Sequence, residues 1–275
     1  MVKTLFKSSK FMIGITILFI LLMFTLMYPL INTGDPFNMD GRPFQEPNET
    51  HLLGTDNFGR DVLLELAHAS RTSLYVGALA GVIAISVGLL VGLFAGYVGG
   101  VVDEILTFIT NIFTVVPSFV ILILISVSLE TRGAWLTALV IGFTAWPWTA
   151  RAVRAQAASL RNRDHIYIAK ISGFSAPKII VLEILPYVAS YVVMAFIIQL
   201  ASGILQESAI SMLGLGPTNK VTLGMMLNWA LMSEAPRIGA WWTFMPSAAM
   251  VGFVTFSLYL INIGMDEIFN PKLRS

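Results

Sequence analysis

The chain has 275 residues, of which 56% are hydrophobic and only 12% are charged, and its formal net charge is +1. Soluble domains carry roughly 25% charged residues, so this composition excludes an ordinary soluble domain and predicts an integral membrane protein. The chain contains no cysteine, which excludes a disulfide framework, a thiolate zinc site and a cysteine nucleophile.

Long uncharged runs recur along the sequence. A hydrocarbon core about 30 Å thick needs about 20 apolar residues in a helix, and unpaired backbone groups are costly in lipid. The sequence therefore predicts an all-α fold whose membrane domain spans residues 74–265 after a first helix. The six expected transmembrane helices are residues 11–31, 74–98, 105–129, 134–150, 187–206 and 241–265, the fourth being short. The first run is too long for a signal peptide and lacks a cleavage site, so we expect it to be retained.

The distribution of lysine and arginine predicts the orientation, because cytosolic loops carry an excess of these residues. Residues 1–10 contain three lysines, and residues 151–186 contain six basic residues against two acidic ones. We therefore place both segments, and residues 266–275, on the cytosolic side of the cell membrane. Residues 32–73, with seven acidic and three basic residues, and residues 207–240 are then external.

The external segment 207–240 is mildly apolar but is interrupted by glycine, proline and lysine, so it is too broken to form a seventh span. We expect a partly re-entrant or interfacial element there. Trp229, Trp241 and Trp242 are expected at the level of the lipid headgroups, where tryptophan is enriched.

Glycines recur at helical spacing in the second run, which allows another helix to approach its backbone closely. They are Gly77, Gly81, Gly88, Gly92 and Gly96. We favour packing within this one subunit over a subunit interface.

The remaining polar features of the runs predict kinks and packing contacts. Asn111 and Pro117 interrupt the third run, and Pro147 lies near the end of the fourth, so we expect kinks there. The six runs contain no ionisable residue, which argues against a proton- or sodium-coupled carrier and against a charge-lined channel. Asn111, Gln199 and Asn262 are expected to form helix-packing hydrogen bonds, and any path to lie at an interface with another subunit.

The basic segment 151–186 has an internal pattern of two short helices. A helix-forming stretch, residues 164–172, runs into Gly173, and a second stretch begins at Ser175 with Pro177 in its first turn. Glycine just after a helix and serine with proline at the next start are typical stop and start residues. This segment is therefore predicted to be two helices joined at a bend.

Sequence patterns for catalysis are missing. The chain has no phosphate-binding loop, no His-Glu-x-x-His helix and no Gly-x-Ser-x-Gly motif, so we expect neither ATP hydrolysis nor other catalysis by this chain. Its histidines, His51, His68 and His165, are far apart in sequence, and we expect no metal site.

The first external segment contains a dense turn motif at residues 53–61. Gly54 and Gly59 permit tight turns, while Asp56, Arg60 and Asp61 can pair or cap the following helix. The sequence predicts a folded external cap, and the functional alternative is a docking surface for an external protein.

These motifs resemble the C-type permease subunits of ABC importers in the dipeptide, oligopeptide and nickel group. The family pattern LGTDxxGRD is matched by residues 53–61, and Arg-x-Ser-Leu by residues 71–74. A stretch similar to ExxxSxLGLG is matched by Glu207, Ser211, Leu213, Gly214, Leu215 and Gly216. Residues 270–274 resemble the ending of the family.

The resemblance also implies a role for residues 151–186, which look like the EAA loop that forms a coupling helix against the ATPase. Tyr167, Ile168 and Ala169 occupy the EAA positions, so the family's glutamate and first alanine are replaced. Gly173 is the family glycine, and Asp164 lies one turn before the missing carboxylate. The ATPase-coupling residues implied are Asp164, Tyr167, Ile168, Ala169, Lys170, Gly173 and Ser175.

The resemblance further implies a type I importer permease with six transmembrane helices. Such a chain pairs with a B-type permease and two ATPase subunits, which bind ATP and magnesium, and it receives substrate from an external binding protein. The implied docking residues are Gly54, Asp56, Gly59, Arg60 and Asp61, and the candidates for the pathway or its outer gate are Glu207, Ser211, Gly214 and Gly216.

The substrate stays open at this point. Peptides are the family default, whereas the tail 261–271, residues 222–227 and the pair Trp241–Trp242 look similar to a branch associated with oligosaccharide uptake. Nickel or metal chelates are a further alternative. A self-sufficient carrier or channel is the competing class, and nucleic-acid binding by the basic segment is disfavoured because membrane spans hold both its ends.

Overall fold

The structure is a computed structural model that describes residues 8–128 and 132–269. The motif at residues 270–274, residues 1–7 of the N-terminal segment and residue 129 of the third expected span lie outside the described residues. The described part is helical throughout, apart from loops and one isolated bridge between Thr55 and Asp61. An all-helical fold was predicted, and the structure confirms it.

The helices follow one another as a bundle of long and short segments. They are α2 (Ser9–Ile31), α3 (Val62–Val98), α4 (Gly100–Val115), α5 (Ser118–Ser128), α6 (Ala134–Leu160), α7 (Asp164–Ile171), α8 (Ala176–Ile179), the π-helical turn η1 (Ile180–Ile184), α9 (Leu185–Met212), α10 (Leu223–Met232), the 3₁₀ turn η2 (Trp241–Thr243) and α11 (Met245–Phe269).

Four helical segments are long and apolar enough to cross a membrane: α2, α3, the continuous run Ala176–Met212, and α11 up to Ile268. The pair α4–α5 makes a fifth if it is counted as one broken span. Helix α6 does not pass the same test, because its apolar stretch is shortened by tryptophan and proline and then meets Arg151 and Arg154. Length and composition thus support four or five spans rather than the six expected.

Three expected boundaries differ from the structure. The second span was expected to begin at residue 74, but α3 begins at Val62, because the Asp61 side chain accepts a hydrogen bond from the backbone N–H of Leu64 at 2.9 Å and caps the helix. The third span was expected to be one helix with kinks, and it is instead two helices bent by 76° before Pro117. The last helix begins at Met245, after Trp241 and Trp242 in the 3₁₀ turn.

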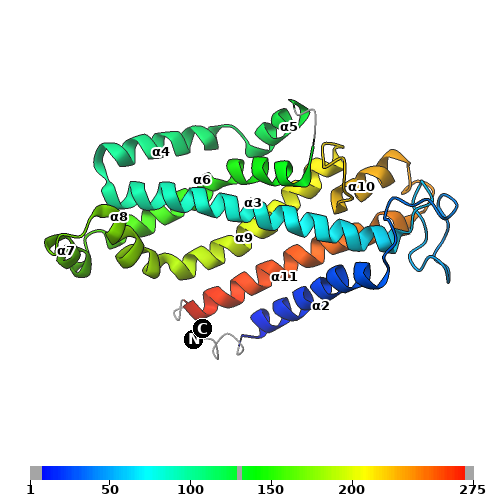
Figure 1. Cartoon of the computed structure of the whole chain (residues 1–275), viewed down its shortest axis with the longest axis horizontal. Coiled ribbons are helices and arrows are strands. Elements are labelled where there is room, and N and C mark those ends of the chain that lie inside the picture. The colour runs from blue at the N-terminus through cyan, green and yellow to red at the C-terminus, as the bar shows by residue number, and fades with distance from the viewer. Residues whose placement is uncertain (1–7, 129–131, 270–275) are drawn as a thin grey trace.

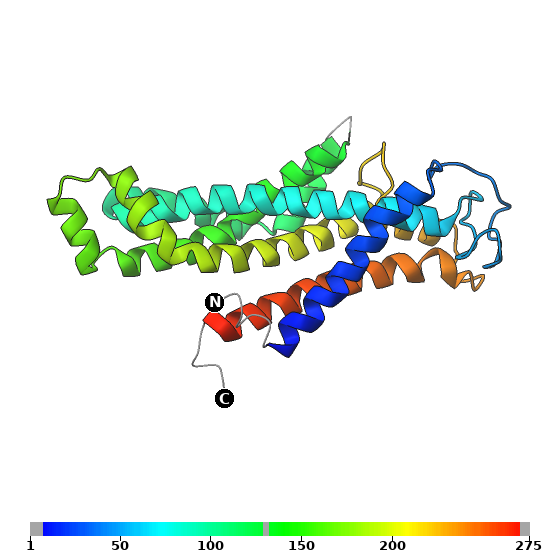
Figure 2. The same cartoon turned by 60° about the horizontal axis from the view of Figure 1, so that its bottom comes forward.

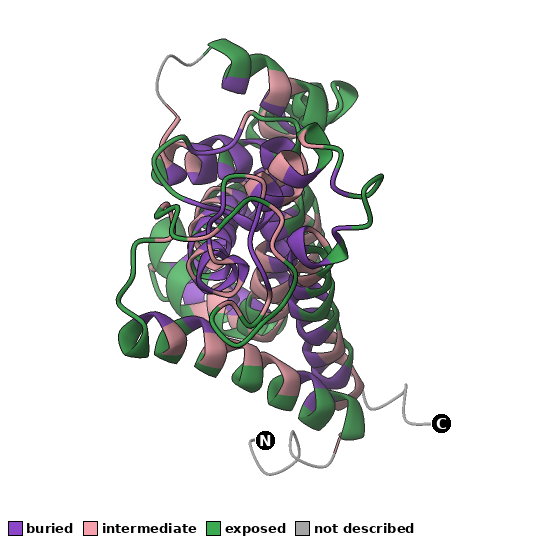
Figure 3. Ribbon diagram, turned by 90° about the vertical axis from the view of Figure 1, so that its right-hand side faces the viewer, coloured by how far each residue is buried: buried purple, intermediate pink, exposed green. Residues whose placement is uncertain are grey.

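The helices form layers around α3 (Figure 1), and a view along the bundle shows the buried residues gathered in its middle (Figure 3). Helices α6 and α9 pack along α3, while α4 and α5 lie over α6 on one side of the bundle. Figure 2 shows α2 crossing α11, and this pair packs against α9 and the outer part of α3 on the other side. The α7–α8 segment lies at one end of the bundle, and residues 32–61 lie at the opposite end.

Glycines set the spacing in the centre of the bundle. A Cβ atom on Gly92 would lie 2.6 Å from the carbonyl oxygen of Ala150 in α6, and a Cβ on Gly88 would lie 2.5 Å from the Thr149 Cβ. A Cβ on Gly203 of α9 would meet Gly77 of α3 at 3.1 Å. The expectation that the glycine series packs within this subunit is confirmed.

Replacing Gly92 by valine should destabilise the bundle by about 1–3 kcal/mol, because the added atoms meet the backbone of α6, which cannot turn aside as a side chain does. The melting temperature of the purified protein in detergent, followed by tryptophan fluorescence, measures the effect. Gly252→Val is the matched control, since nothing lies within 4 Å of a Cβ at that position. Equal melting temperatures for the two variants would contradict the proposed packing.

Candidate functional site

The segment between α6 and α9 forms two short helices with a tight bend. Helix α7 ends in a glycine cap: the N–H of Gly173, at φ 78°, donates to Lys170 and the N–H of Phe174 donates to Ala169, both at 3.1 Å. This pair of bonds is the Schellman arrangement, which needs a residue with positive φ. Ser175 then precedes α8, which has Pro177 in its first turn. The bend predicted from the sequence is therefore present.

The inner side of α7 is anchored in a hydrophobic cluster. Ile166 and Ala169 are buried, and they belong to one cluster with Leu160 of α6 and Ile184 before α9. Tyr97 of α3 belongs to it too, with the Lys170 ammonium 5.3 Å from its ring centroid. The short helix is thus held against the ends of three long ones.

The outer side of α7 is exposed and apolar. Tyr167, Ile168 and Ile171 are 66%, 63% and 72% exposed, although they lie on a helix at the end of the bundle. Single exposed apolar residues are common, and here three of them gather on one short helix. We call this cluster the α7 apolar face.

The two sides of α7 divide the predicted coupling residues. Ala169 is buried and supports the helix, while Asp164, Tyr167, Ile168 and Lys170 are exposed. Gly173 and Ser175 lie in the exposed bend. The structure thus brings these residues together in one segment, and their coupling role stays a prediction.

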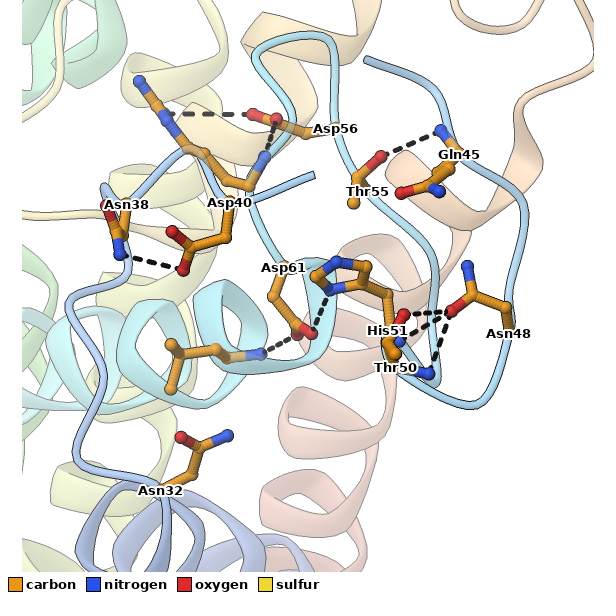
Figure 4. Close-up of polar contacts among 12 residues, drawn as sticks. Asn32, Asn38, Asp40, Gln45, Asn48, Thr50, His51, Thr55, Asp56 and Asp61 are labelled. Atoms are coloured by element: carbon orange, nitrogen blue, oxygen red, sulfur yellow. Dashed lines mark hydrogen bonds and ion pairs between the residues drawn. The ribbon is translucent and has the colours of Figure 1, made fainter. Parts of the chain in front are cut away.

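At the opposite end, residues 32–61 fold into a compact cap, whose side-chain contacts are drawn in Figure 4. Gly54 and Gly59 adopt φ values of 67° and 85°, and loop segments of the cap are joined by backbone bonds such as Gly41 N–H to Gly59 O at 2.9 Å. Asp61 both caps α3 and lies 2.9 Å from His51 Nδ1. The expected folded cap is therefore present, while its external position and the docking of another protein on it stay predictions.

Arg60 is the buried centre of the cap. Its guanidinium lies 4.3 Å and 4.6 Å from the ring centroids of Phe58 and Trp229, in cation–π geometry. It also lies 3.4 Å from a carboxylate oxygen of Glu65 and 3.9 Å from one of Asp56. Burial raises the pKa of Asp56, while backbone N–H donors from Arg60 and Phe58 and the Arg60 charge oppose that rise.

Two of the three tryptophans expected at the headgroups pack against the cap, and their level in the membrane stays a prediction. Trp242 is buried, and its indole N–H donates to the Thr55 carbonyl at 3.1 Å, so it joins α11 to the cap. Trp229 packs on Arg60, as described above. Trp241 alone is half-exposed, because the cap that covers the other two does not cover it.

The residues proposed for an outer gate form a buried network instead of an open surface. Both carboxylate oxygens of Glu207 accept hydrogen bonds at 2.6 Å, one from Ser73 of α3 and one from Ser211. Ser73 Oγ in turn accepts from the Leu223 N–H at 3.1 Å, so the network joins α3, α9 and α10. Neither Glu207 nor Ser211 has exposed surface, which favours a structural role for both.

Gly214 and Gly216 lie in the turn that follows α9. Gly214 has φ 77°, and its carbonyl accepts from the Arg132 guanidinium at 2.9 Å. Gly216 lies so close to Ser211 that no side chain would fit. These glycines allow the chain to fold back onto the Glu207 network, and their gate role stays a prediction.

A feature missed in the sequence is a polar cavity at the α4–α5 bend. It has a volume of about 370 Å³ and is lined from five helices and the α4–α5 connection, among others by Thr114, Pro147, Gln199, Ser202 and Gln206. Gln199 was recognised only as a packing residue, and its amide does donate to Ala145 O and Thr149 Oγ1. The polar residues at 199, 202 and 206 share one face of α9, a spacing that could have indicated the cavity.

No site for a resident metal ion is evident: within residues 8–128 and 132–269, no group of three or more His, Cys, Asp or Glu could hold one. The buried carboxylates described above are instead satisfied by serine hydroxyls or by Arg60.

Removing Arg60 should destabilise the protein strongly, by about 3–5 kcal/mol, because Arg60→Ala leaves Glu65 buried without its cation. Thermal unfolding and protease cleavage within residues 32–61 measure the loss. Arg237→Ala is the control, since that guanidinium is 80% exposed and pairs only with the exposed Glu234. A cap that stays protease-resistant in Arg60→Ala would show that Arg60 does not hold it together.

Comparison with known proteins agrees with this architecture. Residues 88–275 match a family described as the binding-protein-dependent transport system inner membrane component. The chain is 27% identical to the oligopeptide transport system permease protein OppC of Bacillus subtilis, over 98% of this chain and 88% of the relative. It is 29% identical to the OppC proteins of Mycobacterium tuberculosis, over 93% and 89%, and of Lactococcus lactis, over 81% and 76%.

The family match covers more than half of the chain, and the relatives match the external cap region as well. Family membership makes the chain a multi-pass permease of the cytoplasmic membrane, distinct from the subunit that hydrolyses ATP. The chain belongs to the family of inner-membrane components of binding-protein-dependent transport systems.

Proposed function

We propose that the chain is the C-type permease of an ABC importer for peptides. The three relatives described above are named for oligopeptides, and they give no support to the oligosaccharide alternative. In this proposal a B-type permease completes the pathway, two ATPases bind ATP and magnesium on the cytosolic side, and an external binding protein delivers the peptide.

The observation that carries the proposal is the α7 apolar face. Its inner anchors are buried in the cluster with α3, α6 and α9, so a force on Tyr167 or Ile168 reaches these helices directly. The basic residues of the segment 151–186 put this end in the cytosol, where an ATPase would meet it. ATP then drives transport only by favouring one arrangement of these helices over another.

The orientation follows from the same segment. With α7 in the cytosol and the cap outside, the broken pair α4–α5 and helix α6 add two crossings to those of α2, α3, α9 and α11, which makes six. The apolar stretch of α6 is the short one. The start of α2 and the end of α11 are joined by Lys10 and Glu267 at 2.5 Å, so these two helix ends lie on one side. In the proposed topology that side is cytosolic.

The contact with the ATPase is expected to differ at position 167, where the glutamate of the EAA pattern is missing. Tyr167 occupies that position and exposes an aromatic ring where the family has a carboxylate. We propose that the ATPase groove receives Tyr167 and Ile168 through apolar contact, and that no carboxylate at position 167 is needed.

The double variant Tyr167→Ala/Ile168→Ala should weaken association with the ATPase subunits about tenfold or more, since buried aromatic anchors dominate such interfaces. Co-purification and peptide-dependent ATP hydrolysis measure it, while an unchanged melting temperature shows that the fold is intact. Leu52→Ala is the control, because Leu52 is equally exposed but lies in the cap. Undiminished association in the double variant would refute the coupling role.

Gly173→Pro should abolish uptake, because proline cannot adopt φ 78° and would break the bend. Gly173→Asn is the matched control, since asparagine tolerates this conformation, and it should retain most uptake. Transport of a labelled tripeptide into vesicles that contain the whole importer provides the measurement. The competing class predicts uptake by this chain alone in liposomes, and such uptake would overturn the proposal.

A further inference from the structure

The cavity at the α4–α5 bend is built differently from the packed interior around it. Its wall on the α4–α5 side is the stretch 113–118, all of it exposed, and the opposite wall is formed by one face of α9. Trp148 and Tyr259 add aromatic surface. No residue in its lining carries a charge. Its volume of about 370 Å³ falls within the range of ligand pockets.

The lining of this cavity offers more hydrogen-bond acceptors than free donors. The Thr114 hydroxyl donates to Asn111 O at 2.8 Å, and the Thr144 hydroxyl donates to Ile141 O at 2.9 Å, so both protons are used within their own helices. Pro147 has no backbone N–H to offer. The hydroxyl oxygens therefore face the cavity as acceptors.

The two glutamines add further acceptors. The amide nitrogen of Gln199 is engaged with Ala145 and Thr149, and that of Gln206 donates to Ser202 at 3.0 Å. The carbonyl oxygen of Gln206 is buried, and within the described part of the chain it has no hydrogen-bond partner. A buried acceptor left unpaired is costly, and a turn of the partly exposed Gln206 side chain would bring this oxygen to a donor in the cavity.

We propose that this cavity is a contact site of the translocation pathway, in which Gln199 and Gln206 accept hydrogen bonds from the backbone N–H groups of a passing peptide. The inference rests on the proposed peptide function and adds the residues and the chemistry. A neutral, acceptor-rich lining suits a transporter of varied peptides. It binds the backbone N–H groups that all peptides share, and it does not select for a charged side chain. The aromatic surface accommodates apolar side chains.

A second, separate cavity lies between α4 and α6. It has a volume of about 230 Å³ and is lined by Thr107, Thr110 and Asn111 of α4 and by Arg151 and Arg154 of α6. Arg154 is paired there with Asp103, so this cavity, unlike the first, has charged side chains at its wall.

The absence of native cysteine allows a direct test of hydration. Ser202→Cys, in the whole importer in vesicles, should react with a charged, water-soluble methanethiosulfonate at least tenfold faster than Val82→Cys. Val82 is a depth-matched control, since it is 49% exposed and its neighbour Gly81 packs on Leu200. Added trialanine with the binding protein should slow the Ser202→Cys reaction. Equal rates at the two positions would overturn the assignment of the cavity.

The chemistry of recognition is tested by uptake. Gln206→Leu should lower uptake of subsaturating trialanine about threefold to tenfold, as expected for one lost hydrogen bond, whereas Gln206→Glu keeps an acceptor oxygen and should retain most uptake. The ratio of wild-type uptake to Gln206→Leu uptake should be smaller for N-methylated trialanine, which lacks the N–H donors, than for trialanine. Equal loss for Gln206→Leu and Gln206→Glu would overturn the role of the acceptor.

The two proposals fail in different ways. If the wild-type importer takes up no trialanine while Ser202→Cys still reacts rapidly, the peptide function and the N–H contact are wrong, although the cavity is hydrated. If trialanine is imported and Ser202→Cys reacts no faster than Val82→Cys, the peptide function stands and the cavity lies outside the pathway.

Discussion

The structure depends on the close approach of α6 and α9 to α3. At Gly88 and Gly92 the backbone of α6 comes near enough that a methyl group would collide with it, and Gly77 does the same for α9. In lipid, where apolar surface gains little from association, this contact between backbones is the main attraction available. The anchors of α7, the Glu207 network and the cavity at the α4–α5 bend all use surfaces that this arrangement creates.

The two ends of the bundle are held together by different kinds of contact. At the cap end, Arg60 lies beside the Glu65 carboxylate and Glu207 accepts from serine hydroxyls, so this end has directional bonds in its interior. At the α7 end, the inner contacts are mainly apolar, with the Lys170 ammonium over the Tyr97 ring, and the outer side is left uncovered. A rigid outer end and an uncovered inner end are what a subunit needs if it is moved from one side only.

Much of this could be predicted from the sequence, because helices in a membrane leave a strong compositional pattern. The glycine packing, the bend before Pro117 and the elbow at Gly173 depend on local residue types, and each is present. The start of α3 was missed because Glu65, His68 and Arg71 resemble a loop by hydropathy. They are helical because Asp61 caps the helix and Arg60 neutralises Glu65, and neither contact leaves a periodic pattern.

The candidate site was predictable only in part, for a related reason. The α7 segment is contiguous, so its bend and its charge pattern could be found directly. The partners of Glu207 and Trp242 lie far away in the chain, at Ser73 and Thr55, and the cavity forms only when five helices meet. A single sequence does not reveal such distant pairings, and Gln199 therefore resembled an ordinary packing residue.

The hydrogen bond from Trp242 to Thr55 links the helices of the protein to one another. It joins the 3₁₀ turn before α11 to a loop that is continuous with α2 on one side and with α3 on the other. The α2–α11 pair and the central bundle are therefore tied at the cap end. Towards the other end, Lys10 and Glu267 join α2 to α11, and the Asn262 amide of α11 donates to the Met194 carbonyl of α9 at 2.9 Å. Because the α2–α11 pair is linked to the central bundle at both places, a displacement of α9 is passed on to α2 and α11 through these contacts.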